Sequence, residues 1–209
     1  MHIYAFGSIC RGDVQAGSDV DLLAIVDDFD SRFDQNTYSI YSYRRLDDLW
    51  QEGNPFAWHL SLESRLVFSS DKDDYLKSLG LPRPYCNCAR DCHKFYSLFR
   101  EAKESIAIGS SSRVFDLSTV FLSIRNFATC YSLEMTDQPD FSRNSALHLG
   151  QLSLAITNEA YDILLRSRIL CTRGYGANIS DRELQVAISQ FERINEWMAF
   201  LTTRVNIDE

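Results

Sequence analysis

The sequence predicts an α/β or α+β domain followed by an antiparallel four-helix bundle, and three observations predict it. The first third alternates short strand-like runs with turn residues. The remainder carries long apolar stripes at helical spacing. Between them, 78–88 (SLGLPRPYCNC) holds two prolines and a glycine and has no helical period, which is typical of a linker. We therefore expect two domains, 1–84 and 85–209.

In the first domain, the strand-like runs are rich in β-branched and aromatic residues and are bounded by Gly, Asp, Asn or Ser. The expected strands are 2–6, 21–26, 37–43 and 65–70. A helix is expected over 44–53, RRLDDLWQEG.

In the second domain, apolar residues recur every three or four positions in four segments, which predicts four amphipathic helices. The stripes run over 92–106, 117–131, 152–164 and 187–201. Ser180 followed by Glu183 predicts a capping box at the start of the last helix. Short polar loops join the stripes, as in an antiparallel four-helix bundle.

Composition excludes several classes of protein. The chain has 209 residues and a net charge of −8, so an extended nucleic-acid surface, which needs clustered Lys and Arg, is not expected. No window approaches the roughly 20 apolar residues of a membrane helix, and the N-terminus lacks signal-peptide features. Six irregularly spaced cysteines do not form a disulfide pattern. A cytoplasmic protein with reduced thiols is expected.

The most informative stretch pairs Gly7-Ser8 with an Asp-x-Asp sequence at 19–21. On a strand, Asp19 and Asp21 would face the same side, about 6 to 7 Å apart, and could hold Mg²⁺ or Mn²⁺. Gly7 would allow close backbone approach, and the Ser8 hydroxyl and nearby N–H groups could grip phosphates. The alternative is that Gly-Ser is a helix cap and Asp-x-Asp a turn.

The whole stretch, FGSICRGDVQAGSDVDLLAIV, resembles the signature of DNA polymerase beta-type nucleotidyltransferases. The family pattern is Gly-Ser, then Arg-Gly, then Ser-Asp-x-Asp-Leu. Its matches here are Gly7, Ser8, Arg11, Gly12, Ser18, Asp19, Asp21 and Leu22. The segment 53–68 also resembles small bacterial (MNT-like) members, so the likeness covers residues 1–70.

This resemblance implies a mixed sheet and the transfer of a nucleoside monophosphate, AMP from Mg-ATP, to a hydroxyl of a small molecule or protein. Asp19 and Asp21 would hold Mg²⁺ or Mn²⁺. The nucleotide would be bound by Gly7, Ser8, Arg11 and Ser18. The identity of the hydroxyl acceptor is not implied.

The sequence departs from the family in two ways. Complete members carry a third carboxylate on a later strand, whereas the corresponding run TYSIYSY contains no acid. Other acids that could act as base are Asp47, Asp48, Glu52, Glu101, Glu104 and Glu134. The apolar run also begins at residue 2, so the helix that usually precedes the first strand is missing. A catalytically impaired nucleotide-binding protein is therefore an alternative.

The helical half contains Arg143 and, five positions on, His148. This spacing resembles the Arg-x4-His motif of HEPN domains, bundles often fused to or encoded beside small nucleotidyltransferases. The helical half also resembles the helical bundle of aminoglycoside nucleotidyltransferases. The HEPN resemblance implies an RNase site at Arg143 and His148, a toxin–antitoxin-like or defence module, and a homodimer through the bundle. The alternative is that Arg143 caps a helix and His148 lies on its flank.

The sequence contains a possible zinc-binding cluster and a histidine in an apolar segment. Cys86, Cys88, Cys92 and His93 could bind zinc, but their spacing differs from that of common zinc sites, and free thiols are the alternative. His59 lies in an apolar segment and is expected to be a core or interface histidine.

Overall fold

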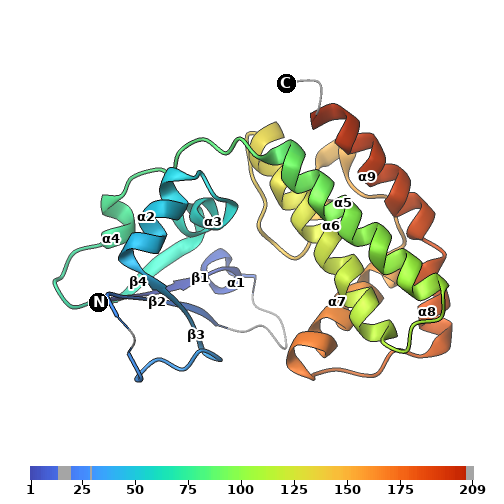
Figure 1. Cartoon of the computed structure of the whole chain (residues 1–209), viewed down its shortest axis with the longest axis horizontal. Coiled ribbons are helices and arrows are strands. Elements are labelled where there is room, and N and C mark those ends of the chain that lie inside the picture. The colour runs from blue at the N-terminus through green and yellow to red at the C-terminus, as the bar shows by residue number, and fades with distance from the viewer. Residues whose placement is uncertain (14–19, 29, 206–209) are drawn as a thin grey trace. The chain divides into compact units, whose positions relative to one another are not determined.

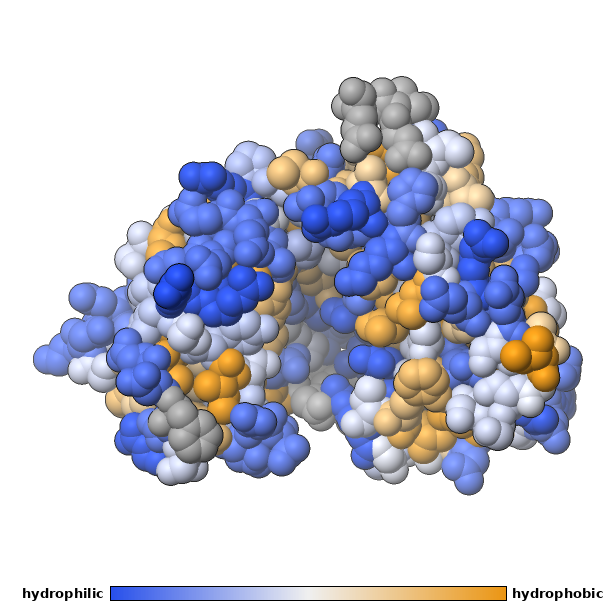
Figure 2. All heavy atoms as spheres, viewed as in Figure 1, coloured by the Kyte–Doolittle hydropathy of each residue, from blue (hydrophilic) through white to orange (hydrophobic). Residues whose placement is uncertain are grey.

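The structure is a computed structural model that describes residues 1–13, 20–28 and 30–205. It divides the chain into two compact units, Met1–Cys86 and Asn87–Glu209 (Figure 1). Within each unit, polar and charged side chains cover most of the face seen in Figure 2, and apolar groups form small separate patches. Among the described helices, none combines the length and apolarity needed to span a bilayer.

The first unit is built on a mixed four-stranded sheet, and all four expected strands form. The strands are β1 (His2–Phe6), β2 (Asp21–Val26), β3 (Tyr38–Ser42) and β4 (Ser64–Ser69), in the order β3-β2-β1-β4. β1 pairs antiparallel with both β2 and β4, and β2 runs parallel to β3. The predicted α+β class is confirmed.

One face of this sheet carries the core of the unit. Side chains alternate along β1, so His2, Tyr4 and Phe6 are buried on the same face. The helices α2 (Tyr43–Gln51), α3 (Pro55–Glu63) and α4 (Tyr75–Ser78) supply the facing residues. The core consists of Tyr4, Phe6, Leu23, Ile25, Leu46, Leu49, Trp50, Ala57, Leu60 and Leu76.

Helix α3 is the longest element of the first unit that the sequence did not predict. Its start is specified locally, because the Asn54 side chain accepts a hydrogen bond from Phe56 N at 2.9 Å and Pro55 occupies the first turn. Its apolar residues are not confined to one stripe, which hides the helical period. The helix runs directly into β4 at Ser64.

The second unit is helical and is organised around α6. Its helices are α5 (Cys88–Ala107), α6 (Arg113–Met135), α7 (Asn158–Arg173), α8 (Asp181–Ile188) and α9 (Phe191–Val205), with short 3₁₀ turns η1 (Ser145–Leu147) and η2 (Gly150–Leu152). Helix α6 packs against α5, α7 and α9. Its buried positions lie around most of its circumference, as expected for a central helix.

Two predicted helical stripes differ in detail from the structure. The third helix begins at Asn158 rather than near residue 152, because η2 occupies 150–152 and the Thr157 side chain caps Ala160 N at 3.2 Å. The fourth stripe is divided between α8 and α9. The Ser180–Glu183 capping box is confirmed, and it starts α8.

Candidate active site

The site begins at the turn that follows β1. Gly7 has φ 74° and ψ −141°, a backbone conformation that side chains strongly disfavour, and the short helix α1 (Ser8–Arg11) starts immediately after it. The Gly7 carbonyl accepts a hydrogen bond from Cys10 N at 3.0 Å. The Ser8 side chain is buried at the strand end. The predicted Gly-Ser pair therefore forms a tight strand-to-helix turn.

The first carboxylate of the site lies against this turn. Asp21 is the first residue of β2 and pairs with Phe6 of β1. A Cβ atom added to Gly7 would lie 2.7 Å from Asp21 Oδ2, so the carboxylate occupies the space that any side chain at Gly7 would need. The structure thus brings Gly7 and Asp21 together. Ser18 and Asp19 lie outside the described residues.

A second carboxylate, Glu63, lies at the same end of the sheet, just before β4, which pairs with β1 on the side opposite to β2. Ser64 of β4 also pairs with Phe6, and Gly7 N donates a hydrogen bond to the Glu63 main-chain oxygen at 3.3 Å. Phe6 is therefore flanked by Asp21 on one side and by the Glu63–Ser64 corner on the other.

The Glu63 side chain joins α1 to α3. Its Oε2 forms an ion pair with Arg11 Nη1 and lies 3.0 Å from His59 Nε2, one helical turn earlier. The three side chains are 14%, 22% and 13% exposed, respectively, so this cluster is largely shielded from solvent. His59 also packs edge-on against Phe6, with ring centroids 5.7 Å apart. His59, expected to be a core or interface histidine, thus contacts both an aromatic ring and a carboxylate.

The other acids proposed as base on the sequence lie elsewhere. Asp47 accepts a hydrogen bond from the Tyr75 hydroxyl at 2.6 Å. The Tyr75 ring lies 5.8 Å from that of His2, at the opposite end of β1 from Gly7. Burial, followed by the bond to Asp47, raises the pKa of Tyr75 above its usual value. Asp47 is thus remote from the Gly7 turn.

The remaining candidate bases have surface or helical-unit positions. Glu52 pairs with Arg45 at 3.0 Å, and Asp48 is exposed on α2. Glu101 and Glu104 are exposed on α5. Glu134 accepts a hydrogen bond from Cys88 N at 3.4 Å, at the start of α5.

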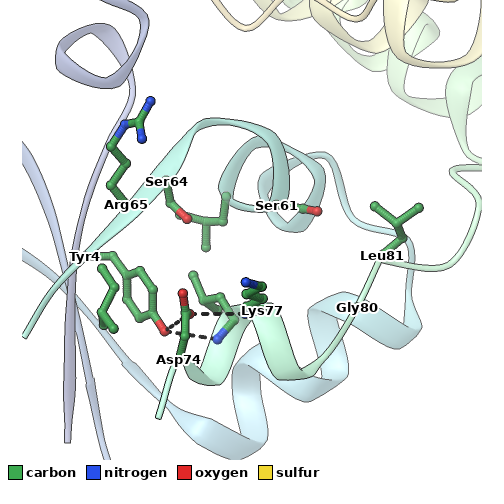
Figure 3. Close-up of a pocket in the computed structure, with 11 residues that line it drawn as sticks. Tyr4, Ser61, Ser64, Arg65, Asp74, Lys77, Gly80 and Leu81 are labelled. Atoms are coloured by element: carbon green, nitrogen blue, oxygen red, sulfur yellow. Dashed lines mark hydrogen bonds between the residues drawn. The ribbon is translucent and has the colours of Figure 1, made fainter. Parts of the chain in front are cut away.

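A pocket of about 640 Å³ opens between β4, α3 and α4 (Figure 3). Its lining includes Ser61, Ser64 and Lys77. The Tyr4 hydroxyl donates a hydrogen bond to Asp74 Oδ1 at 2.8 Å and accepts one from Leu76 N at 3.0 Å. These bonds join β1 to α4 where both line the pocket. The volume is within the range of small-molecule sites, and the pocket begins beside Ser64, next to Glu63.

The Gly7 turn, the adjacent Asp21 carboxylate and the short helix α1 thus lie together at one end of the mixed sheet. Residues 2–80 match the family model for a nucleotidyltransferase domain. The matched region contains Gly7, Ser8, Arg11 and Asp21, together with Glu63. No curated protein matches the chain. The helical unit lies beyond the matched residues, so its HEPN-like character stays a prediction.

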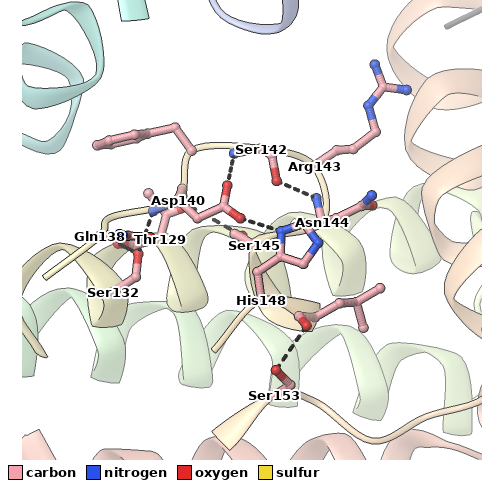
Figure 4. A network of polar contacts seen from close by, with 12 residues as sticks. Thr129, Ser132, Gln138, Asp140, Ser142, Arg143, Asn144, Ser145, His148 and Ser153 are labelled. Carbon is pink, nitrogen blue, oxygen red and sulfur yellow. Dashed lines mark hydrogen bonds and ion pairs between the residues drawn. The ribbon is translucent and has the colours of Figure 1, made fainter. Parts of the chain in front are cut away.

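In the helical unit, Arg143 and His148 lie in the connection between α6 and α7, around η1 (Figure 4). His148 Nδ1 contacts Asp140 Oδ2 at 2.6 Å, and the His148 side chain is 55% exposed. Burial alone would raise the pKa of Asp140, but hydrogen bonds from Ser142 and His148 outweigh it and hold that pKa below its usual value. The Asp140 carboxylate fixes the position of Nδ1. Nε2 is therefore the ring nitrogen of His148 that does not face this carboxylate.

The cysteines of the predicted zinc cluster do not converge with His93. Cys88 and Cys92 are buried, with their sulfur atoms 3.7 Å apart, whereas Cys86 and His93 are exposed. The neighbouring Cys88 thiol and burial raise the pKa of Cys92 far above its usual value, which opposes the thiolate form that metals bind. Within the described part of the chain, no three His, Cys, Asp or Glu side chains are grouped as metal ligands.

Proposed function

We propose that the N-terminal unit transfers a nucleoside monophosphate, AMP from Mg-ATP, to a hydroxyl of a small molecule or protein. The observation that carries this proposal is the contact of the Asp21 carboxylate with Gly7 at the start of α1. Because the turn has no side chain, a phosphate can approach its main-chain N–H groups next to a carboxylate that can bind a metal ion. The nucleotidyltransferase match over residues 2–80 supports the same chemistry.

Each residue of the site has a role in this proposal. Gly7, Ser8 and Ser18 bind the triphosphate through main-chain N–H and hydroxyl groups, and Arg11 offsets its charge. The hard carboxylate oxygens of Asp21 fit Mg²⁺ or Mn²⁺, and Asp19 precedes it by two residues. When bound, such a metal ion offsets the charge on the triphosphate as pyrophosphate leaves.

The reaction forms a bond between the acceptor oxygen and the α-phosphorus, and it breaks the bond to the bridging oxygen of pyrophosphate. The acceptor hydroxyl loses its proton in this step. A carboxylate close to the Gly7 turn is the type of group that can accept it.

The test is pyrophosphate release from each of the four NTPs with Mg²⁺ or Mn²⁺. Wild-type protein is compared with Asp19→Asn and Asp21→Asn, using a panel of aminoglycosides and the protein itself as acceptors. We expect acceptor-dependent release that both substitutions abolish. Asp48→Asn is the matched control, because Asp48 is an exposed acid on α2. Release that persists in Asp21→Asn would overturn the assignment, and ATP binding without release would indicate a nucleotide-binding protein.

A second candidate function, RNA cleavage by the helical unit, is favoured by the contact between Asp140 and His148. The carboxylate orients the imidazole, as an acid–base group requires. Arg143 lies on the same loop and would offset phosphate charge. RNA degradation lost in His148→Ala and kept in His93→Ala would support this function. A homodimer through the helical unit, measured by light scattering, is the assembly proposed for it.

A further inference from the structure

Glu63 contacts both ends of α1. Its main-chain oxygen accepts a hydrogen bond from Gly7 N, just before the helix. Its side chain binds Arg11, the last residue of the helix. The two phosphate-binding elements of the proposed nucleotide site, the Gly7 turn and the Arg11 guanidinium, are therefore fixed to the same corner between α3 and β4.

The Arg11 guanidinium is only partly satisfied by this contact. Nη1 is engaged by Glu63, whereas Nε is shielded from solvent and has no hydrogen-bond partner among the residues that the structure describes. A buried donor without an acceptor costs about 1 to 3 kcal/mol, and a bound ligand is one explanation for such a group in a native structure. A phosphate oxygen is an acceptor that suits a guanidinium.

Glu63 is itself held in place. His59, one turn earlier on α3, contacts the same Oε2 at 3.0 Å, and its ring is fixed by Phe6 and Phe56. Because its main-chain oxygen is held by Gly7 N and its carboxylate contacts the fixed His59 ring, the Glu63 side chain has little freedom to move. It can therefore restrict Arg11, which would otherwise have many rotamers to lose on binding a phosphate.

We propose that Glu63, supported by His59, is the positioning residue for Arg11 at the triphosphate. It preorganises the guanidinium so that an N–H donor remains for the phosphates that leave as pyrophosphate. This inference rests on the proposed nucleotidyl transfer and assigns to that site a residue outside its sequence motif. Glu63 acts through Arg11, not as a metal ligand or base.

The test measures dissociation constants for Mg-ATP and for AMP by calorimetry, because positioning of Arg11 affects only the phosphates that AMP lacks. We expect Glu63→Ala to weaken Mg-ATP about tenfold, the loss of one charge-assisted contact, and to leave AMP within about twofold. Glu63→Gln keeps an oxygen acceptor for Arg11 and should recover most of the affinity. Glu52→Ala is the matched control, since Glu52 pairs with Arg45 on the surface.

A double-mutant cycle identifies the route of the effect. If Glu63 acts through Arg11, then Glu63→Ala should change Mg-ATP affinity by less than about twofold when Arg11 is already alanine. Equal losses for Mg-ATP and AMP would show a merely structural role and overturn the inference. So would unchanged or tighter Mg-ATP binding in Glu63→Ala, or a full loss in the Arg11→Ala background. A wild-type protein that binds no Mg-ATP would instead refute the proposed function, and this inference with it.

Discussion

Replacing Gly7 with alanine should impair the nucleotide site far more than the fold. The new Cβ would lie 2.7 Å from Asp21 Oδ2, whereas ordinary contacts begin near 3.4 Å, so the carboxylate must move by about 0.7 Å. That carboxylate is the end of a side chain and can move at little cost. The positive φ of Gly7 adds strain of about 1 to 3 kcal/mol, which a domain with typical stability of about 5 to 15 kcal/mol tolerates.

The functional effect of this displacement is larger. Misplacing a reacting group by about 1 Å can cost about 100-fold in rate, so we expect kcat/KM for pyrophosphate release to fall by about 10- to 100-fold. Mg-ATP affinity should fall as well. Gly80→Ala is the control, because Gly80 has φ +67° in the same unit and a Cβ there meets nothing within 4 Å.

The assay pairs Mg-ATP titration and pyrophosphate release with urea unfolding of both variants. A Gly80→Ala protein with strained backbone and full activity would show that strain alone is harmless to the site. If Gly7→Ala stays folded and binds Mg-ATP as tightly as the wild type, the contact between Gly7 and Asp21 does not matter, and the reasoning is refuted.

Three further predictions concern stability and chemistry. Gly53→Ala should destabilise the first unit in urea unfolding by more than Gly80→Ala, which should cost roughly 1 to 2 kcal/mol. The reason is that a Cβ on Gly53 would meet the main chain of Pro84 at 2.4 Å. Equal losses of stability in the two variants would contradict this. Asp140→Asn should lower the free energy of unfolding by about 1 to 2 kcal/mol at pH 7. Because the pKa of Asp140 is lowered in the native state, the difference in stability from the wild type should disappear as the pH falls below 3.8. A difference that persists in acid would contradict this. In thiol labelling, exposed Cys171 should react in the native state and buried Cys92 only on unfolding.

Much of the fold could be predicted because its signals are local. The four strands and α2 have alternating or amphipathic runs bounded by turn residues, and Ser180 and Glu183 mark a helix start within four residues. Helix α3 was missed even though Asn54-Pro55 is a start signal, because its apolar residues surround it. The division between α8 and α9 was missed because the stripe continues across the break.

The residues of the site could likewise be predicted only where their signal is local in the sequence. Gly7, Ser8 and Arg11 are in a short motif, and their link to Asp21 follows from strand pairing of neighbouring segments. Glu63 was missed because it lies 52 residues from Arg11 and meets it only when β4 pairs beside β1. The acids named from the sequence as candidate bases lie elsewhere, whereas Glu63 reaches the Gly7 turn from the side of β1 opposite to β2.

The position of β1 also has a consequence for biosynthesis. Strand β1 is synthesised before both of its partners, and its second partner, β4, is made only after β2, β3, α2 and α3. The Tyr4 hydroxyl likewise waits for Asp74, 70 residues later. Until then one edge of β1 is unpaired, and such edges favour pairing with other chains. A nascent chain that ends before Ser64 should therefore be prone to aggregation, whereas one that extends past Cys86 contains every strand of the sheet.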